Sequence, residues 1–328
     1  MDIEVRTRHA GKTYQFNEGH DPRQPAQYWF QNPPEGLTLF IVLYTQACRW
    51  SRCLGCNLSS RVSARHVPFG DIMGQIDHLF LQLLTQQHRV DLRKIILSNN
   101  GSVLDEETFS TTALIYFVAM MNLHCPNLST VSIETRPEYI EWEELEVLAR
   151  ALKEGNTPTD LELAVGFEAF DDRIRNDYFR KGLALDTFEH MVKMVAEYDF
   201  KLKVYFMQKP VPNITEEEGI RDIMQAIDYL NALAKRFDID INMHLNPTYV
   251  AKGTELERAF LAGEYNPPRM ESVMRAVRHA EHAGISVYVG MDDEGLAVEG
   301  GSFIRSGDEY IVRKLEEFNR TQDYNLLR

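Results

Sequence analysis

Short apolar runs alternate with longer helical patterns along most of this 328-residue chain. Several runs are almost continuously apolar, which is typical of strands buried on both faces of a parallel sheet. We expect strands at residues 37–44, 94–98, 128–134, 161–168, 202–207, 241–246 and 285–290. This succession of strand–helix units with a last strand predicts an α/β fold, a partial TIM-type (β/α)6 barrel with short N- and C-terminal extensions.

Between these runs, apolar residues recur at helical spacing. We expect helices at residues 69–84, 105–121, 141–155, 184–199, 216–238 and 269–284. Asp105 can cap the second of these helices, and Gly155 ends the third. We therefore expect an N-terminal extension at 1–36, a barrel domain at 37–300 and a C-terminal extension at 301–328. The last of these should contribute a strand and a helix that pack on the barrel.

The sequence predicts neither a membrane segment nor a secretory signal. Its longest mostly apolar run, at 37–44, is far shorter than the ~20 residues that span a bilayer. Residues 1–12 contain no apolar signal core. We therefore expect a cytoplasmic protein that makes no contact with a membrane.

The formal net charge of −14 disfavours a general nucleic-acid-binding face, because contacts with phosphates need clustered Lys and Arg. A local basic strip remains compatible with this charge, although the same residues can also form an ordinary solvated loop. The strip consists of Arg49, Arg52, Arg61, Arg65 and His66.

Three of the four cysteines lie in the loop that follows the first expected strand, with the spacing C-x4-C-x2-C. In a reducing compartment, such a cluster indicates a metal or catalysis rather than a disulfide framework. Cys48, Cys53 and Cys56 can hold three corners of a cubane iron–sulfur cluster and leave one iron without a protein ligand. A zinc site that adds His66 as fourth ligand is the alternative, and a metal-free redox triplet is a third. Cys125 should lie at the opposite end of the barrel, in or near the core.

A three-cysteine loop after the first strand of a parallel barrel resembles the radical S-adenosylmethionine (SAM) enzymes. The similarity covers roughly residues 37–300. The common family spacing is C-x3-C-x2-C with an aromatic residue before the third cysteine. Here four residues separate the first pair, and Gly55 takes the aromatic position.

Further motifs make the chain most similar to the branch that holds the Elongator catalytic subunit and the archaeal enzymes of archaeosine synthesis. The C-R-W motif begins at Cys48, G-S-x-L-D at Gly101, and E-T-R-P-E at Glu134. Shorter matches are G-x-E at 166–168, K-G at 181–182, K-P at 209–210, N-P at 246–247 and K-G-T-E at 252–255.

The resemblance implies site residues at the ends of the strands, where chemistry takes place in such barrels. Small polar residues after the second strand would hold the methionine part of SAM. Glu134 can accept ribose hydroxyls, and Arg136 can grip a carboxylate. The implied SAM-binding residues are Ser98, Asn99, Asn100, Gly101, Ser102, Glu134, Arg136, Glu168 and Asn246. Structural roles (a turn, a Glu–Arg pair or packing) are the alternative for each of them.

Two further residues are candidates for catalysis. Lys209 ends the fifth strand and can bind an anion or donate a proton, unless it is a solvated loop lysine. Asp292 follows the last strand and is a substrate-pocket candidate together with Asp293.

The resemblance implies a [4Fe–4S] cluster, SAM and an external one-electron donor that is flavodoxin-like or ferredoxin-like. Reductive cleavage of SAM would give a 5′-deoxyadenosyl radical that abstracts hydrogen from a substrate. That substrate would be a modified nucleoside or a tRNA-modification intermediate, with tRNA bound through the local basic strip or a partner protein. The alternatives are a free small metabolite, such as an amino-acid or nucleoside derivative, and a non-catalytic zinc-binding scaffold that binds a nucleotide.

Overall fold

The computed structural model describes residues 2–328, and the chain divides into two compact units. The first unit contains the chain up to Glu4, Gln15–Trp50 and Leu58–Val165. The second contains Val5–Tyr14, Ser51–Asn57 and Gly166–Arg328. Each unit is described by itself below. The cysteine loop contributes to both, because Cys48 belongs to the first unit while Cys53 and Cys56 belong to the second.

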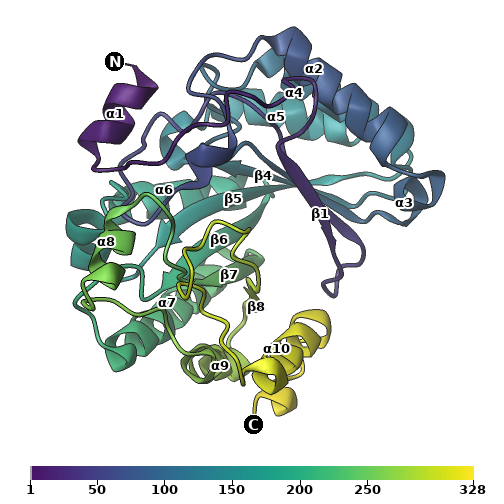
Figure 1. Ribbon diagram of the computed structural model, residues 1–328. Coiled ribbons are helices and arrows are strands. Elements are labelled where there is room, and N and C mark those ends of the chain that lie inside the picture. The colour runs from purple at the N-terminus through teal and green to yellow at the C-terminus, as the bar shows by residue number, and fades with distance from the viewer. Residues whose placement is uncertain (1) are drawn as a thin grey trace. The chain divides into compact units, whose positions relative to one another are not determined.

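The strands of the described chain form a sheet that follows chain order (Figure 1). Their bounds are β1 Gln27–Gln31, β2 Thr38–Val42, β3 Lys94–Ser98, β4 Thr130–Thr135, β5 Asp160–Glu168, β6 Lys201–Gln208, β7 Ile241–Pro247 and β8 Ser286–Val289. Strands β2 to β5 pair in parallel, as do β6 to β8. All seven strands expected from the sequence are present.

Strand β1 was not expected, because it lies in the polar N-terminal segment. It pairs antiparallel with β2, with Trp29 opposite Phe40. The two rings stack with 4.2 Å between their centroids. Trp29 thereby packs against a cluster formed by Phe40, Val42 and Ile96. Three consecutive aromatic residues between two glutamines show no alternation of apolar and polar positions, which makes them too weak a signal to predict a strand.

Helices of the first part of the chain include one that begins later than expected. Their bounds are α1 Ile3–His9, η1 Leu58–Arg61, α2 Phe69–His78, η2 Leu79–Leu83, α3 Gln86–Asp91, α4 Thr111–His124, η3 Pro137–Tyr139 and α5 Trp142–Leu152. The expected start of α4 at Asp105 is wrong, since Asp105 lies in a turn whose carbonyl accepts hydrogen bonds from the Thr108 and Phe109 N–H groups. Helix α4 lies between α2 and α5 (Figure 1).

Helices of the second part alternate with β6 to β8. Their bounds are η4 Arg173–Tyr178, α6 Leu185–Glu197, α7 Glu216–Phe237, α8 Glu255–Leu261, α9 Met270–Arg278, η5 His279–His282, α10 Glu309–Thr321 and η6 Tyr324–Leu327. A capping box between Thr215 and Glu218 starts α7. This helix packs on β6 and β7, and α10 packs on β8. Between residues 301 and 308, where we expected a strand, the chain forms loops and turns, so that expectation is wrong.

Among the described residues, no helix is both long and apolar enough to cross a membrane.

Candidate functional site

In the first unit, an ion pair joins the C-R-W motif to the G-S-x-L-D motif. Cys48 is half-buried and follows β2. The Nε atom of Arg49 lies 3.2 Å from Oδ2 of the buried Asp105, and Nη1 of Arg49 pairs with Glu107. Burial raises the pKa of Asp105, while the charge of Arg49 opposes that rise. The Asp105 carboxylate, which we expected to cap a helix, therefore holds Arg49, the residue next to the first cysteine.

The turn at residues 98–102 also lies against Cys48. A Cβ atom at Gly101 would stand 3.2 Å from the Cα atom of Cys48. The Asn99 side chain accepts a hydrogen bond of 3.1 Å from the Gly101 N–H, and Asn100 donates one to the Leu58 carbonyl. The positive φ of this turn belongs to Asn100, at 57°, and not to Gly101.

The E-T-R-P-E motif, at the end of β4, contacts the chain at Ser102 and Val103. The hydroxyl groups of Thr135 and Ser102 lie 2.7 Å apart, and the Glu134 carbonyl accepts a hydrogen bond from the Val103 N–H. The guanidinium of Arg136 lies 4.5 Å from the ring centroid of Trp50 and also pairs with Glu138 at 2.5 Å. The unit thus brings together three motifs that are far apart in the sequence.

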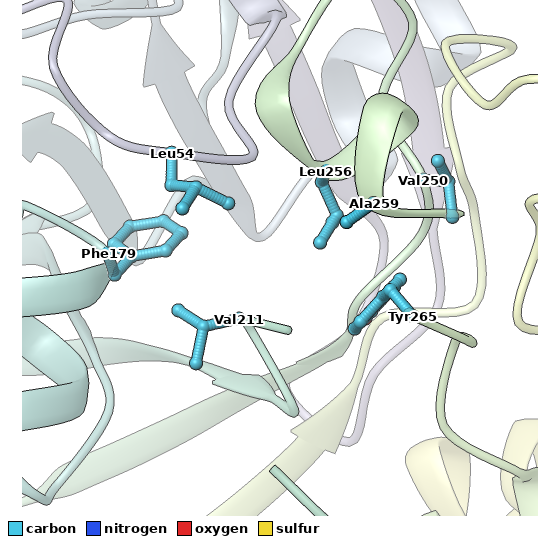
Figure 2. Close-up of a cluster of buried hydrophobic side chains, with 7 residues drawn as sticks. All are labelled: Leu54, Phe179, Val211, Val250, Leu256, Ala259 and Tyr265. Atoms are coloured by element: carbon cyan, nitrogen blue, oxygen red, sulfur yellow. The ribbon is translucent and has the colours of Figure 1, made fainter. Parts of the chain in front are cut away.

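In the second unit, the part of the cysteine loop around Cys53 lies against buried apolar side chains. The Leu54 N–H donates to the Phe179 carbonyl over 2.9 Å. Cys53 packs against a cluster of buried side chains (Figure 2), formed by Leu54, Phe179, Val211, Val250, Leu256, Ala259 and Tyr265. Burial raises the pKa of the Cys53 thiol to about 11, while the positive charges of Lys181 and Lys12 lower it.

An ion pair in this unit joins two of the short motifs. Oε1 of Glu168, at the end of β5, lies 2.6 Å from Nζ of the buried Lys181. A Cβ atom at Gly166 would stand 2.3 Å from Glu168 Oε1 and 2.4 Å from Lys181 Nζ. A side chain at position 166 would have to displace the pair from this position. G-x-E and K-G are weak signals alone, but here they describe one contact.

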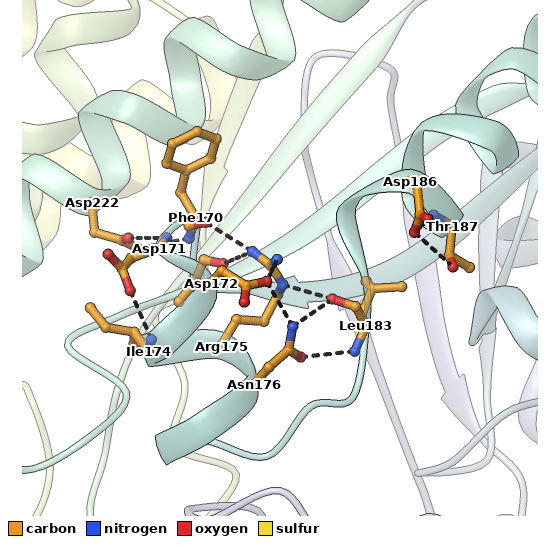
Figure 3. A network of polar contacts seen from close by, with 11 residues as sticks. Phe170, Asp171, Asp172, Ile174, Arg175, Asn176, Leu183, Asp186, Thr187 and Asp222 are labelled. Atoms are coloured by element: carbon orange, nitrogen blue, oxygen red, sulfur yellow. Dashed lines mark hydrogen bonds and ion pairs between the residues drawn. The ribbon is translucent and has the colours of Figure 1, made fainter.

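The buried Arg175 holds the loop between Glu168 and Lys181 in place (Figure 3). Its guanidinium donates to three backbone carbonyls, those of Ala169, Phe170 and Leu183, and pairs with Asp172. Burial lowers the pKa of Arg175, and nearby carboxylates oppose that effect. The sequence offered no signal for this role, because an arginine in a polar segment is normally exposed.

The other candidate residues of the second unit lie near or after the ends of strands β6, β7 and β8. Nζ of Lys209 contacts Glu216 at 3.3 Å and the Asn266 carbonyl at 2.9 Å. Asn246 ends β7, and a Cβ atom at Gly290 would stand 2.3 Å from its Oδ1 atom. The exposed Asp292 accepts a hydrogen bond from the Glu294 N–H. These positions leave the roles of Lys209, Asn246 and Asp292 as predictions.

Cys125 is buried, as expected, and its burial raises the pKa of the thiol to about 12. Within residues 2–328 no group of three or more Cys, His, Asp or Glu side chains is arranged as a metal site, and His66 is exposed. The donors available on Cys48, Cys53 and Cys56 are soft sulfur atoms, which suit an iron–sulfur cluster chemically.

Comparisons with known proteins agree with these motifs. Archaeosine synthase subunit beta of Methanosarcina acetivorans is 28% identical over 329 residues, covering 98% of this chain and 89% of that protein. N-terminally truncated Elp3 of Methanocaldococcus infernus has a TM-score of 0.50 at 17% identity, with 76% of this chain and 59% of that chain covered. Spore photoproduct lyase complexed with dinucleoside spore photoproduct has a TM-score of 0.50 at 14% identity, with 76% of each chain covered. No family model matches the chain.

Elp3 and spore photoproduct lyase are both radical SAM enzymes. This chain is similar in sequence to archaeosine synthase subunit beta and similar in fold to these radical SAM enzymes. The resemblance drawn from its motifs is thereby confirmed, and so is the expected fold class, since these radical SAM structures have partial TIM barrels. In this chain, the strand ends carry the polar residues described above.

Proposed function

We propose that Cys48, Cys53 and Cys56 bind a [4Fe–4S] cluster and that the chain uses it to cleave SAM. When bound, the cluster would deliver the electron that splits SAM into methionine and a 5′-deoxyadenosyl radical, which abstracts hydrogen from the substrate. A flavodoxin-like or ferredoxin-like protein would supply that electron. The observation that carries the proposal is the contact of Gly101 with Cys48, because it puts the polar turn that would hold SAM beside a cluster ligand.

The first unit would bind the methionine and ribose parts of SAM. The backbone and side chains of Ser98, Asn99, Asn100, Gly101 and Ser102 would hold its ammonium and carboxylate groups. Glu134 would accept the ribose hydroxyls, and Arg136 would bind the carboxylate. The hydrogen bond within the turn and the one between Ser102 and Thr135 support these roles, because a site that is already ordered loses little entropy on binding.

Residues of the second unit are also assigned to the proposed function. We assign Glu168 and Asn246 to SAM binding, with the Lys181 ammonium holding the Glu168 carboxylate in place. Lys209 and Asp292 are the proposed catalytic residues, Lys209 as an anion-binding or proton-donating group and Asp292 as a substrate contact. The glycines beside Glu168 and Asn246 support this assignment, because each leaves space for a polar side chain.

The proposed substrate is a modified nucleoside or a tRNA-modification intermediate. The name of the relative in Methanosarcina acetivorans, archaeosine synthase subunit beta, supports this class and a partner subunit. Because the net charge of −14 disfavours a general nucleic-acid-binding face, tRNA would bind through such a partner or through the local basic strip. A free amino-acid or nucleoside derivative remains the alternative substrate.

The cofactor proposal is tested on protein purified and reconstituted without oxygen. Wild-type protein should contain about four irons per chain, as a cubane cluster requires, and should form 5′-deoxyadenosine from SAM and dithionite. Cys48→Ala should lose this product, whereas Cys125→Ala, which alters a cysteine outside the motif, should keep it. A colourless protein with one zinc per chain and no SAM cleavage would contradict the proposal and favour the zinc scaffold.

The substrate proposal needs a different readout. Candidate substrates deuterated at non-exchangeable positions would be tested as free nucleosides and within tRNA, with and without a partner subunit. Transfer of deuterium into 5′-deoxyadenosine from either nucleoside form would support the proposed class. Transfer only from free amino-acid derivatives would favour the alternative.

A further inference from the structure

The N-terminal residues 11–14 are docked on the K-G-T-E loop of the second unit. The Thr13 N–H donates to the Gly253 carbonyl over 2.8 Å, and Arg258 donates to the Gly11 carbonyl over 2.9 Å. A Cβ atom at Gly253 would stand 2.6 Å from the Tyr14 nitrogen. The segment between Gly11 and Tyr14 is therefore held by specific backbone contacts.

The same loop also accepts a hydrogen bond from the residue that follows the third cysteine of the motif. Asn57 directly follows Cys56, and its side-chain amide donates to the Lys252 carbonyl at 3.1 Å and the Leu296 carbonyl at 3.2 Å. Residues 252 and 253 thus hold the N-terminal segment and the cysteine loop at once. This arrangement holds the segment that carries Lys12 and the residue that follows Cys56 on one loop.

Lys12 is a buried lysine with no acidic partner. Lys12 is only 3% exposed. Its Nζ atom lies 5.8 Å from the ring centroid of Tyr14. The buried Lys94 and Lys181 each pair with a glutamate, at 2.8 and 2.6 Å. Among residues 2–328, no carboxylate lies within ion-pair distance of Lys12. A buried ammonium without an anion is costly, so Lys12 fits a site that acquires negative charge.

We propose that Lys12 is a positioning residue for the cluster, and that its buried positive charge beside the cysteine loop raises the cluster's reduction potential. This inference rests on the proposed function. Reduction adds one electron, supplied by the external donor, and so adds one negative charge to the cluster. A positive charge buried nearby stabilises the reduced form more than the oxidised form, because screening is weak where water is excluded.

The test measures the reduction potential of the reconstituted holoprotein by a redox titration followed by electron paramagnetic resonance. Lys12→Met should shift the equilibrium of one-electron reduction about tenfold toward the oxidised cluster, which is about 59 mV more negative. Lys12→Arg keeps the charge and should stay near the wild-type value. Lys252→Met removes a charge from the exposed side of the same loop and should leave the potential unchanged.

Other outcomes would overturn the inference. A Lys12→Met protein with full iron content and the wild-type potential would show that the charge has no effect on the cluster. Loss of iron from both Lys12→Met and Lys12→Arg, with unchanged potential in the remaining cluster, would make Lys12 a packing residue. If the wild-type protein itself binds no [4Fe–4S] cluster, the proposed function fails first, and the iron count distinguishes that result.

Discussion

Gly101 lies against Cys48 with no space for a side chain between them. Its hypothetical Cβ atom would also stand 3.4 Å from the Cβ atom of Cys48. The neighbouring Asn100 adopts the left-handed backbone, which asparagine tolerates better than most residues. The sequence S-N-N-G-S predicts a turn at this point. It cannot tell which residue takes the positive φ, because both Asn and Gly accept that conformation.

We expect Gly101→Ala to displace the cysteine loop by a few tenths of an ångström. Overpacking of this kind costs about 1–3 kcal/mol, so SAM binding should weaken by roughly tenfold or more. The measurement is equilibrium binding of SAM to reconstituted protein, with the iron content as a second readout. Gly70→Ala is the control, since nothing lies within 4 Å of the added methyl group. Equal SAM affinity in both variants would show that the contact has no effect on the site.

At the scale of elements, the strands could be predicted well and the helix boundaries less so. β3 begins and ends where the sequence placed it, at Lys94 and Ser98, because a short apolar run between polar segments has clear limits. The start of α4 could not be predicted, because Asp105 has the chemistry of both a cap and an ion-pair partner. Which of these two roles Asp105 takes depends on Arg49, which is distant in the sequence.

The ion pair between Lys94 on β3 and Glu162 on β5 is almost fully buried, with 5% and 6% of the side chains exposed. Lys94→Met should lower the free energy of unfolding by about 3–5 kcal/mol, because it leaves a carboxylate buried without its partner. The double variant Lys94→Met with Glu162→Leu should recover most of that loss. Urea unfolding measures both changes, and a single variant as stable as the wild type would contradict the prediction.

The docking of the N-terminal segment predicts different results for two glycines with nearly the same backbone, Gly253 at φ +75 and Gly263 at φ +76. Alanine in this conformation costs about 1–2 kcal/mol at either position. Only at Gly253 does the methyl group also meet the backbone of Tyr14. Hydrogen exchange should therefore accelerate at the Thr13 amide in Gly253→Ala and not in Gly263→Ala. The same exchange rate in both variants would argue against specific docking.

At the scale of the whole molecule, the alternation of strands and helices was enough to predict the strand order. The contacts that build the candidate site were less predictable, because they join loops whose conformations depend on distant residues. The N-terminal segment is an example. It looked like a polar extension, yet its Thr13 bonds to Gly253, and no local pattern in the sequence reports that contact.

Buried acids should make the folded chain sensitive to alkaline pH. Burial raises the pKa of Cys125 and of Tyr324 to about 12, from 9.0 and 10.0. These groups stay protonated in the folded chain but ionise when it unfolds, so their stabilising effect is complete below about pH 9 and is lost as the pH rises toward 12.

Between pH 8 and 10.5, Cys125 alone should account for a loss of about 1–2 kcal/mol. Urea unfolding at the two pH values measures the loss, and Cys125→Ala should show a smaller dependence on pH. An unchanged dependence in Cys125→Ala would mean that this thiol does not titrate with unfolding.

The hydrogen bonds of Asn57 have a consequence for the order in which the protein is made. Its carbonyl partners lie 195 and 239 residues further along the chain. At about 5–20 residues per second, they leave the ribosome roughly 10–50 seconds after Asn57. We expect ribosome-stalled chains that end before Lys252 to be cleaved by protease at residues 51–57, and released chains to resist. Iron delivery to these cysteines would then be a step that follows translation rather than one that accompanies it.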